Sequence, residues 1–392
     1  MSGIASSACL RAAVACLVSL LLRAGPSPAA PRPADGAPPV PPIASVTDLG
    51  VVQQDKLVQC RDGTYSARVG HRAVWTFGDT CLRRAGVDGR FIDNSLAWNT
   101  DFDASGGLAL DHDRKDIDGV PARFIPFTDN ELAYNEAHPD GQVALWPGNL
   151  VDDAGRQRVL VFYGAILRGD NGAFTPIGAG IAVADPRFTS VYRPLENPKK
   201  KAFDPTYLWN GAEQAYTAGS VVVGDMLYAY GGEAVGLATH VHVARVPLAQ
   251  ALDKASWTYW NGSGWSSRNG ALATIYQGGA AGDSVFRDAW LGLYVTVYQR
   301  YLDNTVYYRV AANPEGPWSQ EVVLFTASEG TQPSYAARVH AEYEEMDGQV
   351  EYITYVKTTG FLEQELPLVK VTFGSLFPST PCAGACPAPT KP

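Results

Sequence analysis

Acidic residues at the ends of apolar strand patterns are the residues of this sequence that could do chemistry. Asp79 follows Trp75-Thr76-Phe77-Gly78, where aromatic side chains alternate as on a β-strand with one buried face. Asp48 lies in the strand pattern of residues 46–51. Two carboxyl groups that flank a glycosidic bond, either about 5 Å or roughly 6.5–9.5 Å apart, can hydrolyse it. Asp48 and Asp79 are therefore the predicted catalytic pair, and the alternative is that they cap turns.

Glu342 is the third predicted catalytic residue. It follows His340 by two positions, so both side chains would lie on one side of a strand and could donate a proton or orient a substrate. The alternative is an exposed hairpin charge, because acidic residues follow directly in the sequence.

Several further residues are predicted to bind substrate. Trp98 and Trp146 could stack on a sugar ring, although either could belong to the core instead. Arg287 could hold a hydroxyl or carboxylate, or pair with a neighbouring aspartate. The remaining predicted substrate-binding residues are Asn94, Glu213, Asp283 and His340.

The elements that must position these side chains are short strands in a recurring pattern. A strand rich in aromatic and β-branched residues occurs five times, at residues 75–80, 161–164, 227–231, 294–298 and 352–356. Another strand pattern precedes each copy, at residues 46–51, 142–146, 218–223, 282–286 and 337–342, and a third follows most copies. Such repetition predicts an all-β fold, a five-bladed β-propeller, with a β-sandwich as the main alternative. A short helix is expected at residues 247–252.

The expected fold decides where a ligand would bind. Propellers bind ligands at one end of the central axis, beside the starts of the innermost strands. The predicted innermost strands carry Asp48, Trp146, Asp283, His340 and Glu342.

Composition and charge limit the partners. The 392 residues are 46% hydrophobic and 11% aromatic, and the net charge is -9. Nucleic acids and anionic membranes need a basic surface, and the longest basic run is residues 199–201. We therefore expect a polysaccharide or oligosaccharide partner, no nucleic acid or membrane partner, and a monomer.

The N-terminal segment and the number of cysteines predict secretion. Residues 1–29 combine Arg11, an apolar run and small residues, which is typical of a signal peptide, with an organelle presequence as the alternative. A Pro-rich linker at 30–45, a propeller at 46–374 and a tail at 375–392 follow. Four cysteines then remain, an even number that suits an extracellular protein. The predicted pairs are Cys60 with Cys81 and Cys382 with Cys386.

Together, several motifs resemble a known family of secreted proteins. They are Thr47-Asp48-Leu49-Gly50, Arg61-Asp62-Gly63-Thr64-Tyr65-Ser66, Trp75-Thr76-Phe77-Gly78-Asp79-Thr80, Asn94-Ser95-Leu96-Ala97-Trp98, Pro314-Glu315-Gly316-Pro317-Trp318-Ser319 and His340-Ala341-Glu342. The chain is identified as a member of domain of unknown function 4185, which is similar to five-bladed propeller glycosidases and to endo-D-arabinanases.

The resemblance implies a secreted glycoside hydrolase that acts on a polysaccharide such as an arabinan. The alternative is a non-catalytic carbohydrate- or protein-binding propeller. No cofactor and no metal ligand are predicted, although a structural cation in the central channel is compatible with the fold.

Overall fold

The described part of the chain folds as antiparallel β-sheet with little helix. A computed structural model describes residues 36–169, 174–194, 206–236, 238–279, 281–300 and 303–376. The predicted signal peptide, Cys382 and Cys386 lie outside these residues. An all-β fold is therefore confirmed for the described part.

Five sheets of four or more strands make up most of the described fold. The first contains β3 (Tyr65–Val69), β4 (Arg72–Phe77), β7 (Ser95–Asn99) and β8 (His112–Asp113). The second contains β9 (Val143–Asp153), β10 (Arg158–Arg168), β11 (Phe174–Ala184), β12 (Val191–Tyr192) and β13 (Trp209–Asn210). The third contains β14 (Gly219–Val223), β15 (Met226–Val235), β16 (Ala238–Pro247), β17 (Thr258–Trp260), β18 (Trp265–Ser266) and β19 (Tyr276–Gly278).

The two remaining large sheets complete the series. The fourth contains β20 (Ser284–Asp288), β21 (Leu293–Gln299), β22 (Thr305–Ala311) and β23 (Val322–Thr326). The fifth contains β24 (Tyr335–Val339), β25 (Val350–Gly360), β26 (Glu363–Glu365), β27 (Pro367–Phe373) and β1 (Ile43–Val51). A small sixth sheet contains β2 (Val58–Arg61), β5 (Thr80–Gly86) and β6 (Gly89–Ile92).

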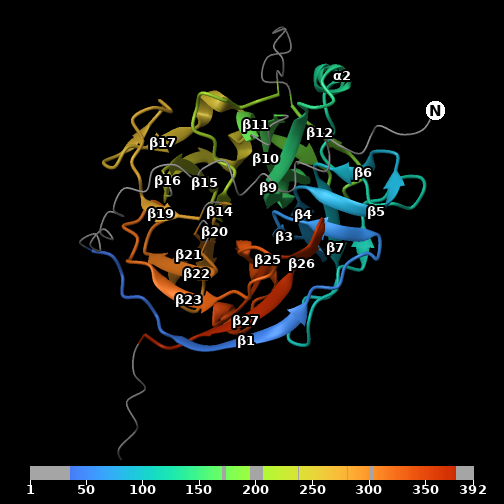
Figure 1. Cartoon of the computed structure of the whole chain (residues 1–392). Helices are drawn as coiled ribbons and strands as arrows, with labels where there is room; N and C mark the ends of the chain where they lie inside the picture. The colour runs from blue at the N-terminus through green and yellow to red at the C-terminus, as the bar shows by residue number, and fades with distance from the viewer. Residues whose placement is uncertain are drawn as a thin grey trace, which may run out of the picture.

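The first strands of the five large sheets lie side by side around a common centre. Contacts join β3 to β9, β9 to β14, β14 to β20 and β20 to β24, and the 3-10 helix η5 (Ala341–Tyr343) after β24 contacts β3. Figure 1 shows the five sheets arranged radially around that centre. The starts of these first strands therefore converge.

The hydrophobic core lies between neighbouring sheets. One buried cluster joins the first sheet to the second, for example through Val74 and Val161, and further clusters join each next pair. Another cluster brings Trp75 of the first sheet against Tyr352 of the fifth. Five apolar interfaces thus hold the sheets, because each sheet buries both of its faces.

Residues 46–51 lie in the fifth sheet, which corrects their expected position. They belong to β1, which pairs with β27 at the outer edge of that sheet. The innermost strand of the first sheet is β3 instead. Alternation of side chains reveals a half-buried strand but not its pairing partner, so the pattern fits both positions. The chain also contacts the sheets before Val46, since Tyr308 donates a hydrogen bond to the carbonyl of Pro41.

Helices are few in the described residues. The α-helix α2 (Asp129–Ala137) begins with a capping box in which Thr128 and Glu131 bond each other's backbone N–H groups. The helix expected at residues 247–252 is the 3-10 helix η3 (Leu248–Gln250). The other 3-10 helices are η2 (Ala154–Arg156), η4 (Lys254–Ser256) and η6 (Met346–Gly348).

Candidate active site

Two carboxyl groups face each other across a long hairpin. The strand that contains β2 and β3 runs antiparallel to the strand that contains β4 and β5, and both ladders keep one register. The paired residues are Arg61 with Thr80 and Tyr65 with Thr76. Between these pairs, residues 62–64 and 78–79 are not regular strand, and there the Asp62 carboxyl group lies beside the chain at Gly78 and Asp79.

Gly78 makes this approach possible. Its backbone N–H donates to the carbonyl oxygen of Asp62 at 2.8 Å. A Cβ atom at position 78 would lie 2.6 Å from Asp62 Oδ1 and 3.7 Å from Trp146 Cδ1. Because glycine has no side chain, the Asp62 carboxyl lies directly against the backbone that precedes Asp79.

Asp79 is held by side chains from the second sheet. Trp146, near the start of β9, donates its indole N–H to Asp79 Oδ1 at 2.9 Å. Arg168, the last residue of β10, forms a close ion pair with the same oxygen. The guanidinium of Arg168 also lies over the ring of Phe91, 5.1 Å from its centroid. The Asp79 side chain remains 22% exposed, so it can be reached from solvent.

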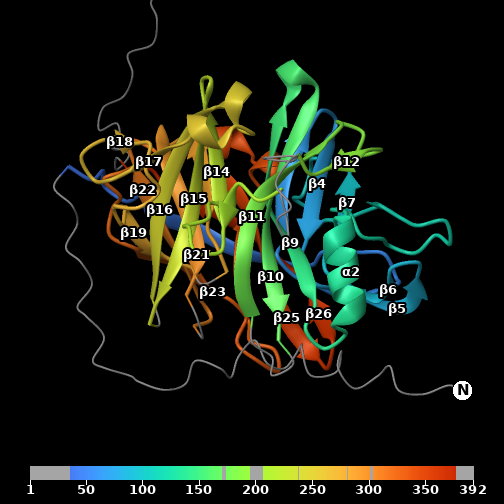
Figure 2. The same cartoon turned by 90° about the horizontal axis from the view of Figure 1, so that it is seen from above.

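Asp62 is held by side chains from the fifth sheet. Tyr335, the first residue of β24, donates its hydroxyl hydrogen to Asp62 Oδ2 at 3.2 Å. Gln364 on β26 donates to the Tyr335 hydroxyl at 2.9 Å. The site therefore draws on three of the large sheets and the small sheet. Figure 2 shows the small sheet and the β25–β26 hairpin at one end of the molecule.

Burial and mutual repulsion change the acidity of the pair. Burial and then the nearby charge of Asp79 raise the pKa of Asp62 to about 7. Burial also raises the pKa of Asp79, although the ion pair with Arg168 and the bond from Trp146 oppose that shift. Asp62 therefore titrates near neutral pH, and it lies beside an Asp79 carboxyl group on which burial and the Arg168 ion pair act in opposite directions.

Glu342 lies in η5, at the opposite end of β24 from Tyr335. Burial raises the pKa of Glu342 to about 7, and the Ser66 hydroxyl hydrogen-bonds its carboxyl group. A shift of this size is typical of functional carboxyl groups. No contact joins Glu342 to the pair formed by Asp62 and Asp79.

His340, which was predicted to bind substrate, has a buried structural position. The residue is fully buried, and its ring stacks on Trp75 with centroids 3.8 Å apart. Its ring nitrogens bond the Ser66 hydroxyl at 2.6 Å and the Thr354 hydroxyl at 2.7 Å. Burial holds the pKa of His340 well below its usual value, so the ring is neutral.

Asp48 is not part of the carboxyl pair, because β1 is an outer strand. The residue is exposed, and its carboxyl group accepts the backbone N–H of Gly50 at 2.8 Å. This is the turn-capping alternative. The predicted pairing of Asp48 with Asp79 is therefore wrong, and Asp62 stands in its place.

Asn94 and Asp283, which were also predicted to bind substrate, are buried and hydrogen-bonded within the fold. Asn94 is fully buried and accepts the backbone N–H groups of Phe124 and Ile125 at 2.8 and 2.7 Å. Asp283 is 1% exposed and accepts the Gly279 N–H at 2.7 Å. Burial raises the pKa of Asp283 to about 6.

Trp98 and Arg287 lie away from the carboxyl pair. Trp98 is on β7, where it packs between His112 and the guanidinium of Arg72. Arg287 donates to the carbonyl oxygens of Asp288 and Leu293. Of the predicted substrate-binding residues, only Trp146 contacts the pair.

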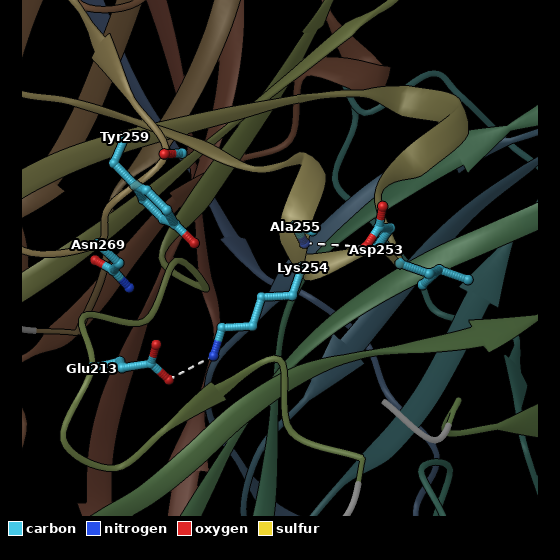
Figure 3. A pocket seen from close by; sticks show the side chains of 8 residues that line it. Glu213, Asp253, Lys254, Ala255, Tyr259 and Asn269 are labelled. Carbon is cyan, nitrogen blue, oxygen red and sulfur yellow. Dashed lines mark hydrogen bonds and ion pairs between the residues drawn. The ribbon is translucent and has the colours of Figure 1, made fainter. Parts of the chain in front are cut away.

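Glu213 lines a separate polar pocket beside the third sheet. Its carboxylate pairs with Lys254 at 2.8 Å, and Tyr259 and Asn269 also line the pocket (Figure 3). No residue of the carboxyl pair or its immediate partners lines it. This pocket is therefore separate from the pair formed by Asp62 and Asp79.

Disulfide bonding, metal-ligand groups and membrane-spanning helices can be examined in the described residues. The predicted disulfide between Cys60 and Cys81 is present. Among the described residues, no three His, Cys, Asp or Glu side chains are grouped closely enough to hold a metal ion. No helix in the described ranges is long and apolar enough to cross a membrane.

Asp62, Arg168 and Tyr335 were absent from the predicted site. Asp62 stands in the sequence Arg61-Asp62-Gly63, which also fits an ordinary turn before a strand. The sequence feature that could have identified Asp62 is an acidic residue shortly before a strand. Arg168 and Tyr335 reach the pair only because sheets distant in sequence lie side by side.

The radial all-β fold and the carboxyl pair can be compared with those of known proteins. The chain belongs to the family described as Domain of unknown function (DUF4185), whose sequence model matches residues 44–357. No curated protein matches the chain.

Two solved structures illustrate the likeness. A Bacteroides ovatus ATCC 8483 protein, provisionally described as a hydrolase, is 15% identical, with 82% of this chain and 87% of that chain covered and a TM-score of 0.52. The catalytic domain of a Coprinopsis cinerea GH62 α-L-arabinofuranosidase is 11% identical, with coverages of 85% and 98% and a TM-score of 0.49. The first comparison shows a shared fold.

Proposed function

We propose that this chain is a five-bladed β-propeller that acts as a glycoside hydrolase, with Asp62 and Asp79 as its catalytic pair. The observation that carries the proposal is that the partly buried Asp62 carboxyl group lies against the backbone of Gly78, directly before Asp79, on one hairpin. The ring of contacts between the first strands supports five blades. The hydrolase description of the Bacteroides ovatus protein agrees with the proposed class.

The two acids have different roles in the proposed reaction. Asp62, with its pKa raised to about 7, protonates the leaving glycosidic oxygen as the carbon–oxygen bond breaks. Asp79 attacks the anomeric carbon through Oδ2, because Trp146 and Arg168 both occupy Oδ1. Asp62 then takes a proton from water, and the hydroxyl group displaces Asp79. Both carboxyl groups return to their starting states.

This assignment includes a stereochemical outcome. Attack by Asp79 gives a covalent glycosyl-enzyme intermediate that water then hydrolyses, so the anomeric carbon undergoes two successive displacements. The proposed mechanism therefore retains the configuration of the anomeric carbon.

The substrate and its location are part of the same proposal. The motif resemblance makes an arabinan the first polysaccharide to test, and Trp146 provides an aromatic face beside the acids. Cleavage of residues 1–29 would release the protein to the extracellular space, where the Cys60–Cys81 disulfide is stable.

Single amide substitutions test the proposal. We expect Asp62→Asn and Asp79→Asn each to lower kcat on a cleaved polysaccharide by roughly 10²–10⁴-fold, because each removes a proton donor or nucleophile. Asp48→Asn is the matched control and should retain full activity, since Asp48 lies on the outer strand. Full cleavage by both site variants would refute the assignment. Binding without cleavage by the wild-type protein would favour a non-catalytic propeller.

A further inference from the structure

The Cys60–Cys81 disulfide lies beside the carboxyl pair on the same hairpin. Cys60 pairs directly with Cys81 in the ladder between β2 and β5. Asp62 follows Cys60 by two residues, and Asp79 precedes Cys81 by two. The disulfide therefore links the two chain segments only two residues away from each acid.

The residues that lie between the disulfide and the acids are held by other contacts. Arg61 forms a buried ion pair with Asp113 of the first sheet. The Thr80 hydroxyl bonds the Ser95 hydroxyl at 2.8 Å. These contacts hold the backbone to the first sheet, but they do not join the two segments that carry the acids to each other.

The ladder between β2 and β5 is weak by itself. β2 contains four residues, and its pairing with β5 is irregular between Val58 and Cys60. The buried cluster of the small sheet consists of Leu82, Ile92 and Val120. The loop closed by the disulfide contains β3 and β4, which the first sheet already orders. The constraint of the disulfide therefore acts mainly on the short segments that carry the two acids.

We propose that the Cys60–Cys81 disulfide is a positioning element for the catalytic pair, which sets the separation between the Asp62 and Asp79 carboxyl groups. This inference rests on the proposed function for its role in catalysis. The effect of the disulfide on the two carboxyl groups can be measured without a substrate.

A titration of the two acids tests the inference. In the full chain with Cys60→Ser and Cys81→Ser, loss of the cross-link separates the acids and admits water. We expect the titration midpoint of Asp62, followed by carboxyl ¹³C NMR, to fall by about one unit, because both changes favour its charged form. Leu82→Ala is the matched control: it weakens the same small sheet, lowers Tm and leaves the midpoint unchanged.

The outcomes separate this inference from the proposed function. An unchanged Asp62 midpoint in the folded double variant would overturn the inference. A shifted midpoint in a protein that cleaves no polysaccharide would support the positioning role and count against the hydrolase. With activity present, kcat should fall at least tenfold while KM stays nearly constant. If neither the serine variant nor Cys60→Val with Cys81→Val folds, the disulfide supports the whole fold, and its local role is refuted.

Discussion

The protonation of Asp62 should control activity near neutral pH. Because this residue donates the proton in the proposed first step, kcat should fall as the pH rises through its pKa of about 7. Tyr335 donates a hydrogen bond to its carboxyl group and so favours the charged form. Tyr335→Phe should therefore raise the pKa of Asp62 and move the alkaline limb of the pH–rate profile upward, by about half a unit.

Phe91→Leu serves as the control for this prediction. It changes the packing of Arg168 near the other acid but leaves Tyr335 in place. A downward movement of the alkaline limb in Tyr335→Phe, or an equal movement in both variants, would show that this hydrogen bond does not tune Asp62.

Among single residues, local sequence features could be predicted, whereas contacts between distant segments could not. Asp79 and the disulfide between Cys60 and Cys81 are local features of the hairpin, so residue types and spacing revealed them. Asn94 was predicted to bind a ligand as a polar residue after the first blade, and His340 as a residue of the last innermost strand that shares a face with Glu342. Their buried hydrogen bonds depend on partners from distant segments, which one sequence does not reveal.

Among the elements, the second strands of the sheets were the best predicted. Residues 161–164, 227–231, 294–298 and 352–356 all lie in strands buried on both faces, where aromatic and β-branched residues accumulate. Residues 46–51 were predicted as a strand but assigned to the wrong sheet position. The capping box of α2 is visible in the sequence at Thr128, yet the short helix has no strong apolar stripe.

The outer strand β1 should contribute to stability through its backbone. Most of its side chains are exposed, so its main interactions are the ladder with β27 and the contact of Pro41 with Tyr308. We expect a chain that starts at Val52 to melt about 5–10 °C lower, because β27 loses its partner and becomes an open edge. A chain that starts at Gly36 keeps β1 and is the control. Equal Tm values for the two chains would show that β1 is dispensable.

Over the whole molecule, buried acids should set the pH of maximum stability. Burial raises the pKa of a group of carboxyls in the described residues: Asp62, Asp283, Asp288, Glu342 and Glu351. Hydrogen bonds and cations lower the pKa of another group: Asp55, Asp103, Asp116, Asp185, Asp303 and Glu345. The two groups act in opposite directions as the pH changes.

The sign follows from comparing the folded and unfolded states. A carboxyl with a raised folded pKa stabilises the fold below its unfolded pKa, near 4, and this contribution is lost as the pH rises through the folded value. A carboxyl with a lowered pKa, such as Asp185 at about 2, stabilises the fold above pH 4 and loses its contribution as the pH falls. Stability should therefore be greatest at about pH 5 and should decline toward pH 8, which calorimetric Tm values across this range would measure.

Glu351 isolates the alkaline side of this profile. It is 1% exposed, both carboxyl oxygens lack hydrogen-bond partners, and burial followed by the charge of Asp288 raises its pKa well above the usual value. Folding at pH 8 must therefore protonate or bury a carboxylate that is charged in the unfolded chain. Glu351→Gln removes that cost and should stabilise the protein by about 1–3 kcal/mol at pH 8, with little change at pH 4. Glu363→Gln, at an exposed position, should change neither value. A gain for Glu351→Gln that is equal at both pH values would instead indicate better packing, because only a proton-linked cost depends on pH.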